Sequence, residues 1–306
     1  MISYLQVDNL SKRFGEQLLF ENISFGIGKG QKVALIAKNG MGKSTLLRII
    51  AGKDTSESGT VIFRNDITVG ILDQDPALDP ENSVFEEVFH SDSPVLKLIK
   101  AYEEAVAHNH TEALEKLIPE MDIHSAWDYD TTIKQILSEL KIDTYDKKIG
   151  QLSGGQKKRA SIAVELLADP KLFFLDEPTS GLDPGTEKNL MMTLSKLSKE
   201  QNKTIVMVTH TTQNLHLCDK IIFMGPGGRL CFCGNVEEAK KFYQTDDLVN
   251  IYNMIAENPE LWQRKFEQSR DRSEISGRRG SMDETQSREI AKKNKGTSGF
   301  RQFGIL

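Results

Sequence analysis

Residues 33–45 read VALIAKNGMGKST, an apolar run that passes through a glycine-rich turn towards a helix. The run is continuous rather than alternating, as in a parallel strand covered on both faces. Apolar residues at helical spacing follow the turn, and Gly52 can end that helix. A turn between such a strand and helix leaves backbone N–H groups free to cradle phosphate oxygens. The segment therefore predicts a phosphate-binding loop.

The side chains of this turn have the chemistry that nucleotide phosphates require. Gly40 and Gly42 leave the backbone unencumbered, and Lys43 supplies a cation for the β- and γ-phosphates. Ser44 can ligate magnesium. The full pattern begins with glycine where this chain has Ala37, and we expect a reduced steric margin rather than lost binding. The predicted cofactor-binding set of the loop is Asn39, Gly40, Gly42, Lys43, Ser44 and Thr45.

A second apolar run ends in two acids. Residues 173–177 read FFLDE, which places two carboxylates at the carboxyl end of a buried strand, where α/β sheets bind ligands. Asp176 would hold the magnesium shell, and Glu177 would polarise the attacking water. The alternative is an acid that only caps the following turn. The residues that follow, PTSGLD at 178–183, together with the phosphate loop favour the catalytic interpretation.

Buried runs and helical patterns alternate through the rest of the chain. Runs at 172–175, 204–209 and 220–224 are separated by helical spacing, which indicates a mostly parallel α/β sheet. The N-terminus alternates apolar and polar residues, as in a half-buried antiparallel part. Apolar residues recur at helical spacing from 95 to 149, so we expect a helical subdomain at about 78–155 inserted in the core.

Composition limits the classes of function. The 306 residues are 38% hydrophobic and 27% charged, which suits a globular chain with a sizeable core. A net charge of −5 argues against a general nucleic-acid binder. Three cysteines are too few for a disulfide framework, so a reducing cytoplasm is expected.

A further glycine-rich motif, LSGGQ at 152–156, lies between the phosphate loop and the acidic strand end. The phosphate loop, Gln74, this motif, LDEPTSGLD at 175–183 and His210 together resemble the ATP-binding cassette (ABC) ATPases over roughly residues 1–240. The resemblance implies ATP and Mg²⁺ as ligands and a head-to-tail pair of cassettes that buries two ATP molecules. The signature residues of one cassette would face the phosphate loop of the other, which adds Ser153, Gly154, Gly155 and Gln156 to the cofactor-binding set.

The same resemblance suggests roles for three single residues. Gln74 would sense magnesium as a further metal ligand and link the core to the helical subdomain; His210 would contact the γ-phosphate. Phe14 would stack on adenine. The predicted catalytic set is thus Glu177, His210 and Gln74. The alternatives are a loop amide for Gln74, a strand-end histidine for His210 and a core aromatic for Phe14.

The two halves of the chain resemble different cassette classes. Residues 1 to about 165 resemble the soluble ABC-F proteins that act on ribosomes, whereas residues from about 175 resemble G-type exporters. We favour the exporter, because this chain has one cassette and because QFGIL at 302–306 resembles a segment leading into a membrane domain. The alternatives are an ABC-F-like ATPase acting on translation, and a chimera or fragment joined near Pro170.

The exporter interpretation fixes the expected organisation. Residues 1–240 would be the ATPase domain, 241–269 a C-terminal helical extension, and 270–306 a flexible linker towards an absent membrane domain. The linker expectation rests on a composition with almost no large apolar residues after about 270. The expected location is the cytoplasmic face of a membrane, with a transmembrane domain as partner.

Overall fold

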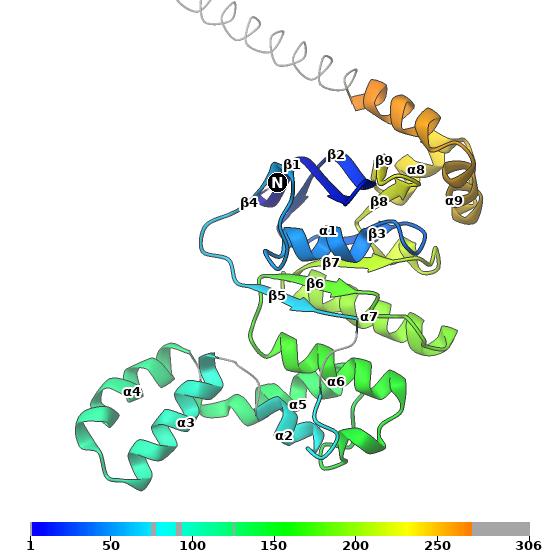
Figure 1. Ribbon diagram of the computed structural model, residues 1–306. Coiled ribbons are helices and arrows are strands. Elements are labelled where there is room, and N and C mark those ends of the chain that lie inside the picture. Colours follow the sequence, from blue (N-terminus) through cyan, green and yellow to red (C-terminus); the bar gives the residue numbers. More distant parts are fainter. Residues whose placement is uncertain (1, 75–77, 90–93, 125, 271–306) are drawn as a thin grey trace, which may run out of the picture.

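The computed structural model describes residues 2–74, 78–89, 94–124 and 126–270 (Figure 1). Its centre is a six-stranded sheet in the order β5-β6-β7-β3-β8-β9, parallel except for β9, which runs antiparallel to β8. All five residues of β3 and of β6 are buried, as their apolar runs predict. The strands are β3 (Lys32–Ile36), β5 (Val69–Leu72), β6 (Leu172–Asp176), β7 (Thr204–Thr209), β8 (Lys220–Gly225) and β9 (Arg229–Gly234).

A three-stranded antiparallel sheet, in the order β2-β1-β4, lies beside the parallel one (Figure 1). Its central strand carries the alternation seen in the sequence, with Leu5 and Val7 fully buried. The predicted mixed α/β fold, with a mostly parallel sheet and an antiparallel N-terminal part, is therefore confirmed. The strands are β1 (Ser3–Phe14), β2 (Gln17–Gly28) and β4 (Ser58–Phe63).

The helices form three groups. Helices α1 and α7 pack against the parallel sheet, and α2 to α6 gather on the side of it away from β1, β2 and β4 (Figure 1). Helices α8 and α9 follow β9, and residues 259–270 are also helical. The bounds are α1 (Lys43–Ile50), α2 (Val84–Phe89), α3 (Pro94–Ala107), α4 (Thr111–Ile123), α5 (Tyr129–Glu139), α6 (Gly154–Leu166), α7 (Pro184–Glu200), α8 (Val236–Tyr243) and α9 (Leu248–Glu257), with short 3₁₀ turns η1 (Ala126–Asp128), η2 (Ile149–Gln151) and η3 (Leu215–Leu217).

The two halves with different resemblances share one sheet. Strands β3 and β5 come from the front half, and each pairs with strands from the back half. At the suggested junction, Pro170 packs on β5, where a Cβ built on Gly70 would lie 3.1 Å from the proline Cβ. Neither half can therefore complete the sheet alone, because neighbouring strands supply each other's hydrogen bonds.

Two features differ from the sequence-based expectations. Strand β5 was not predicted, because it has four residues, contains Gly70 and forms the edge of the sheet, where Val69 is 40% exposed. The C-terminal helices begin at Val236 rather than 241, since Asn235 and Glu238 form a reciprocal capping box there. The linker expected at 270–306 lies outside the described residues, apart from Arg270. In the described part of the chain, no helix combines the length and apolarity needed to cross a membrane.

One buried lysine makes the stability of the fold depend on pH. Lys32, at the start of β3, has no exposed surface, and its Nζ donates to the carbonyl oxygen of Met191 on α7 at 2.7 Å. Burial lowers the pKa of Lys32 from 10.5 to about 8. Between about pH 8 and 10.5 the unfolded chain thus binds more protons than the native one, so this group makes the free energy of unfolding rise with pH.

Replacing Lys32 with methionine should remove that pH dependence. The free energy of unfolding of the wild type, taken relative to Lys32→Met, should increase by about 3 kcal/mol from pH 8 to pH 10.5. Comparing the two proteins cancels the other groups that titrate in this range. Urea denaturation at several pH values measures the difference in free energy of unfolding between the two proteins. A difference that does not change with pH would contradict the lowered pKa of Lys32.

Candidate functional site

The phosphate loop joins the end of β3 to the start of α1. Gly40 and Gly42 have φ of 81° and 76°, values that residues with side chains rarely adopt. A Cβ at Gly42 would also lie 3.3 Å from the Cβ of Leu19 on β2, so the loop lies close against that strand. The two glycines therefore keep side chains away from the start of α1, which leaves its first N–H groups available to an anion.

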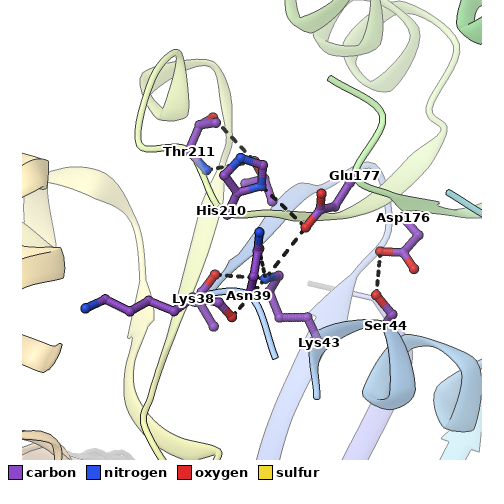
Figure 2. Close-up of polar contacts among 10 residues, drawn as sticks. Lys38, Asn39, Lys43, Ser44, Asp176, Glu177, His210 and Thr211 are labelled. Carbon is purple, nitrogen blue, oxygen red and sulfur yellow. Dashed lines mark hydrogen bonds and ion pairs between the residues drawn. The ribbon is translucent and has the colours of Figure 1, made fainter. Parts of the chain in front are cut away.

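Lys43 is buried in this turn and folded back over it (Figure 2). Its Nζ donates to the carbonyl oxygens of Ala37 and Lys38 at 2.9 and 3.0 Å and to Oδ1 of Asn39 at 3.2 Å. It also lies 3.7 Å from Oε1 of Glu177. Burial lowers the pKa of Lys43, and the charge of Glu177 opposes that shift. Ala37, where the full pattern has glycine, thus contributes through its carbonyl oxygen.

Asp176 and Ser44 meet across the turn. The hydroxyl of Ser44 donates to Oδ1 of Asp176 at 3.0 Å, which joins the first turn of α1 to the end of β6 (Figure 2). Asp176 is 5% exposed, and burial raises its pKa, against the lowering effect of the Ser44 hydrogen bond. A desolvated carboxylate beside a hydroxyl is the oxygen environment that a small divalent cation prefers.

Glu177 lies between two basic side chains. Its Oε1 is 3.7 Å from Nζ of Lys43 and 3.4 Å from Nδ1 of His210, which follows β7 (Figure 2). The backbone of Glu177 has φ 46°, a strained value for a residue with a side chain, and its N–H donates to the carbonyl of Val208. Within the described residues, Nδ1 of His210 is buried and has no hydrogen-bond partner of good geometry.

Lys43, Ser44 and Glu177 line one cavity of about 390 Å³, a volume within the range of small-molecule sites. Asp176 and His210 are not among its lining residues and contact Ser44 and Glu177, respectively. Phe14, at the end of β1, is 71% exposed at this cavity, and Gln74, just after β5, reaches it from the parallel sheet. The structure thus brings together most of the predicted set. The lining residues are Phe14, Leu19, Asn39, Gly40, Gly42, Lys43, Ser44, Thr45, Gln74 and Glu177.

The LSGGQ motif lines a second cavity, of about 510 Å³. Ser153 caps α6 and exchanges hydrogen bonds with Gln156, so both side chains are fixed by the helix start. Gly154 and Gly155 follow without side chains. Elsewhere on α6, the amine of Lys158 donates to the backbone carbonyl of Gln74, which links the signature helix to the first cavity's rim.

Sequence reasoning assigned no site role to several residues that line the cavities. Leu19 of β2 lines the first one because the antiparallel sheet lies against the phosphate loop. Asp183 lines the second and caps α7 through the N–H groups of Gly185 and Thr186, and the Asp-Pro pair at 183–184 was the readable signal for that cap. The residues added at the second cavity are Arg159, Gly181, Leu182, Asp183 and Thr186.

Residues 20–180, more than half of the chain, match the ABC transporter family. The chain belongs to this family. Its members are ATPases, so the cassette binds and hydrolyses ATP. The sequence-based identification of an ABC ATPase is confirmed.

Relatives of the cassette include transport and translation proteins. It is 35% identical over 245 residues to an uncharacterized ABC transporter ATP-binding protein of Bacillus subtilis, YfmR, covering 77% of the cassette and 38% of the relative. It is 30% identical over 263 residues to an ABC transporter ATP-binding/permease protein of Mycobacterium tuberculosis, covering 82% and 28%. It is 33% identical over 179 residues to the energy-dependent translational throttle protein EttA of that species, covering 56% and 32%. The chain thus spans between 28% and 38% of the length of these relatives.

Solved structures share the fold. A nucleotide-free ATP-binding cassette from an ABC transporter aligns with a TM-score of 0.62 at 25% identity, over 82% of this chain and 99% of that one. A dimeric cassette in a post-hydrolysis state, bound to ADP and Pi, aligns with a TM-score of 0.56 at 26% identity, over 76% and 98%.

Proposed function

We propose that the cassette hydrolyses Mg²⁺-ATP as a head-to-tail pair and powers a membrane transporter of the exporter type. The observation that carries the pairing is the division of the predicted cofactor-binding residues between two cavities. Lys43 and Glu177 border the first, and Ser153 to Gln156 line the second. A complete site then requires the second cavity of another chain.

Each residue at the first cavity has a role that its contacts suit. Lys43 would exchange its backbone acceptors for the β- and γ-phosphates, and the loop N–H groups would hold the remaining oxygens. Glu177 would accept a proton from the attacking water, and His210, whose Nδ1 lies 3.4 Å from Oε1 of Glu177, would contact the γ-phosphate. Phe14, exposed at the rim, would stack on the base.

The residues at the Ser44–Asp176 contact fit a magnesium ion. Both side chains offer oxygen, and the raised pKa of Asp176 reflects a buried charge that a cation would relieve. Gln74, which lines the same cavity as Ser44, would complete the protein ligands. A bound Mg²⁺ would supply neutralisation of phosphate charge during transfer.

Features at the second cavity support an approaching partner. Among the described residues, Nε of Arg159 is buried there and has no hydrogen-bond partner. The start of α6 offers the backbone N–H group of Gly154, where an added Cβ would meet no atom within 4 Å and an anion could approach. A related cassette with ADP and Pi is described as dimeric.

The transporter role is supported by similarity to a transport protein. One relative is described as an ATP-binding/permease protein and matches over 263 residues at 30% identity. Helices α8 and α9 follow the sheet and pack against it, with Tyr243 and Ile251 buried. The second candidate, a role in translation, is favoured by the 33% identity to the throttle protein.

Ribosome binding separates the two candidates. We expect Glu177→Gln protein, saturated with Mg²⁺-ATP, to show no salt-sensitive sedimentation with ribosomes, because the net charge of −5 disfavours contact with RNA phosphates. Lys43→Ala protein is the matched control at an ATP concentration that saturates only the Glu177→Gln protein, since it weakens nucleotide binding and changes a buried side chain. Stable, ATP-dependent association of the Glu177→Gln protein alone would reverse the ranking. A reading frame that carries apolar spans of about twenty residues beside this cassette would support the transporter.

A further inference from the structure

The phosphate loop has a contact outside the nucleotide cavity. Lys38 belongs to the loop, and its carbonyl oxygen accepts the hydrogen bond from Lys43 at 3.0 Å. Its side chain extends in the opposite direction, away from Glu177 (Figure 2). The ammonium lies 5.9 Å from the centroid of the Tyr252 ring on α9, within reach of a cation–π attraction.

Helix α9 is firmly held, so Tyr252 has a fixed position. Ile251 and Ile255, its neighbours on the helix, are buried in the main core. Ile255 packs on Gly225 at the end of β8, where an added Cβ would lie 3.0 Å from Cγ2 of Ile255 and 2.9 Å from Cβ of Pro259. Glycine at this position therefore allows α9 to approach the sheet closely.

Little space separates the loop from the helix. The cavity between them has a volume of about 10 Å³ and is lined by Lys38 and Met41 from the loop and by Tyr252 and Ile255 from α9. That volume is at the lower limit for a single water molecule. The loop is thus packed against a helix on one side while its other side faces the nucleotide cavity.

We propose that Tyr252 is a positioning residue for the phosphate loop, acting through the side chain of Lys38. The contact holds the loop backbone in its binding conformation before nucleotide arrives, so less ordering is required on binding. Helix α9 lies outside residues 20–180, so ATP affinity depends on a segment beyond the matched family region. The inference rests on the proposed nucleotide site but not on the transporter role.

The test is a set of substitutions on the full chain, with ATP affinity and steady-state kinetics as readouts. Tyr252→Leu should raise the Kd and KM for Mg²⁺-ATP about three- to tenfold and leave kcat nearly unchanged, as expected for a cation–π contact. Tyr252→Phe should restore wild-type affinity, since phenylalanine keeps the ring face. Lys38→Met should reproduce the Tyr252→Leu effect, and the double variant should be no weaker than either single one.

Controls separate this role from a structural one. Val249→Ala changes an exposed residue of the same helix, 52% exposed, and should leave the Kd unchanged. If Tyr252→Leu does not fold, Lys38→Met still tests the contact, because Lys38 is an exposed loop residue. The inference is overturned if Lys38→Met leaves the Kd unchanged, if Tyr252→Phe is as weak as Tyr252→Leu, or if the two effects add. Normal ATP binding by Lys43→Ala would instead refute the nucleotide site itself.

Discussion

Replacing Lys43 with alanine should abolish ATP hydrolysis and weaken ATP binding about 10- to 100-fold, the loss expected when a charged hydrogen-bond donor to phosphate is removed. The amine is buried in the loop, and its acceptors there are two backbone carbonyl oxygens and Oδ1 of Asn39, which cannot replace the lost cation. Fluorescence titration with a labelled ATP analogue measures the affinity, and phosphate release measures the rate.

A lysine away from the loop provides the control. Lys171→Ala removes a half-exposed amine near Asp169 and should leave both quantities unchanged. Wild-type turnover in Lys43→Ala would contradict the assignment of the whole loop.

The head-to-tail arrangement predicts that a variant of the second cavity can complement Lys43→Ala. Ser153→Arg should bind ATP normally as a monomer and fail in hydrolysis, because Ser153 lines the second cavity and not the first. Mixing Ser153→Arg with Lys43→Ala chains should then restore hydrolysis. Each mixed pair contains one site with an intact lysine from one chain and an intact serine from the other. A mixture as inactive as its components would count against the trans arrangement.

Replacing Glu177 with glutamine should lower the hydrolysis rate about 100- to 10,000-fold while ATP binding survives, as expected for loss of a general base. The amide keeps the shape of the side chain between Lys43 and His210 but removes the charge that would orient water. ATP should then hold two chains together, because the step that ends the paired state is blocked. Light scattering with Mg²⁺-ATP measures the association.

The same substitution elsewhere controls for the chemical change. Glu139→Gln alters a glutamate of comparable exposure on α5, with side chains 16% and 11% exposed, whose carboxylate contacts Lys196 and accepts a hydrogen bond from Gln201, both away from the nucleotide cavity. It should hydrolyse ATP at the wild-type rate. A Glu177→Gln protein that hydrolyses ATP normally would refute the role of Glu177, and one that stays monomeric with saturating ATP would argue against pairing by the isolated chain.

Much of the fold could be predicted from the sequence, because its central elements follow one another directly along the chain. The apolar run at 33–36, the glycines at 40 and 42 and the helix after them are consecutive, and each element agrees with the next. Strand β5 was not readable, because its four residues become a strand only by pairing with β6, which lies about a hundred residues later. Its pairing with the back half is also what carries Gln74 to the cavity.

The amino-acid sequence by itself determined the kind of chemistry. Lys43, Ser44, Asp176, Glu177 and LSGGQ have side chains and spacings that specify phosphate binding and hydrolysis before any contact is known. Glycines allow the backbone conformation that the phosphate loop needs, and the charged side chains supply its functional groups. Both are properties of a short segment of sequence. The identification of an ABC ATPase rested on the resemblance of these motifs, in their order along the chain and together with Gln74 and His210, to that family.

Tertiary structure decided which of these groups share a cavity. Glu177 reaches both Lys43 and His210 because β6, β3 and β7 end at one edge of the sheet, a result of parallel pairing between distant strands. The signature motif lies at another cavity, which the start of α6 lines together with Gly181, Leu182 and Asp183 from the turn after β6. Likewise, the Tyr252 ring lies near the Lys38 ammonium because Gly225 allows α9 to pack closely against β8. Contacts between segments far apart in the chain depend on packing of the whole core, which no local pattern encodes.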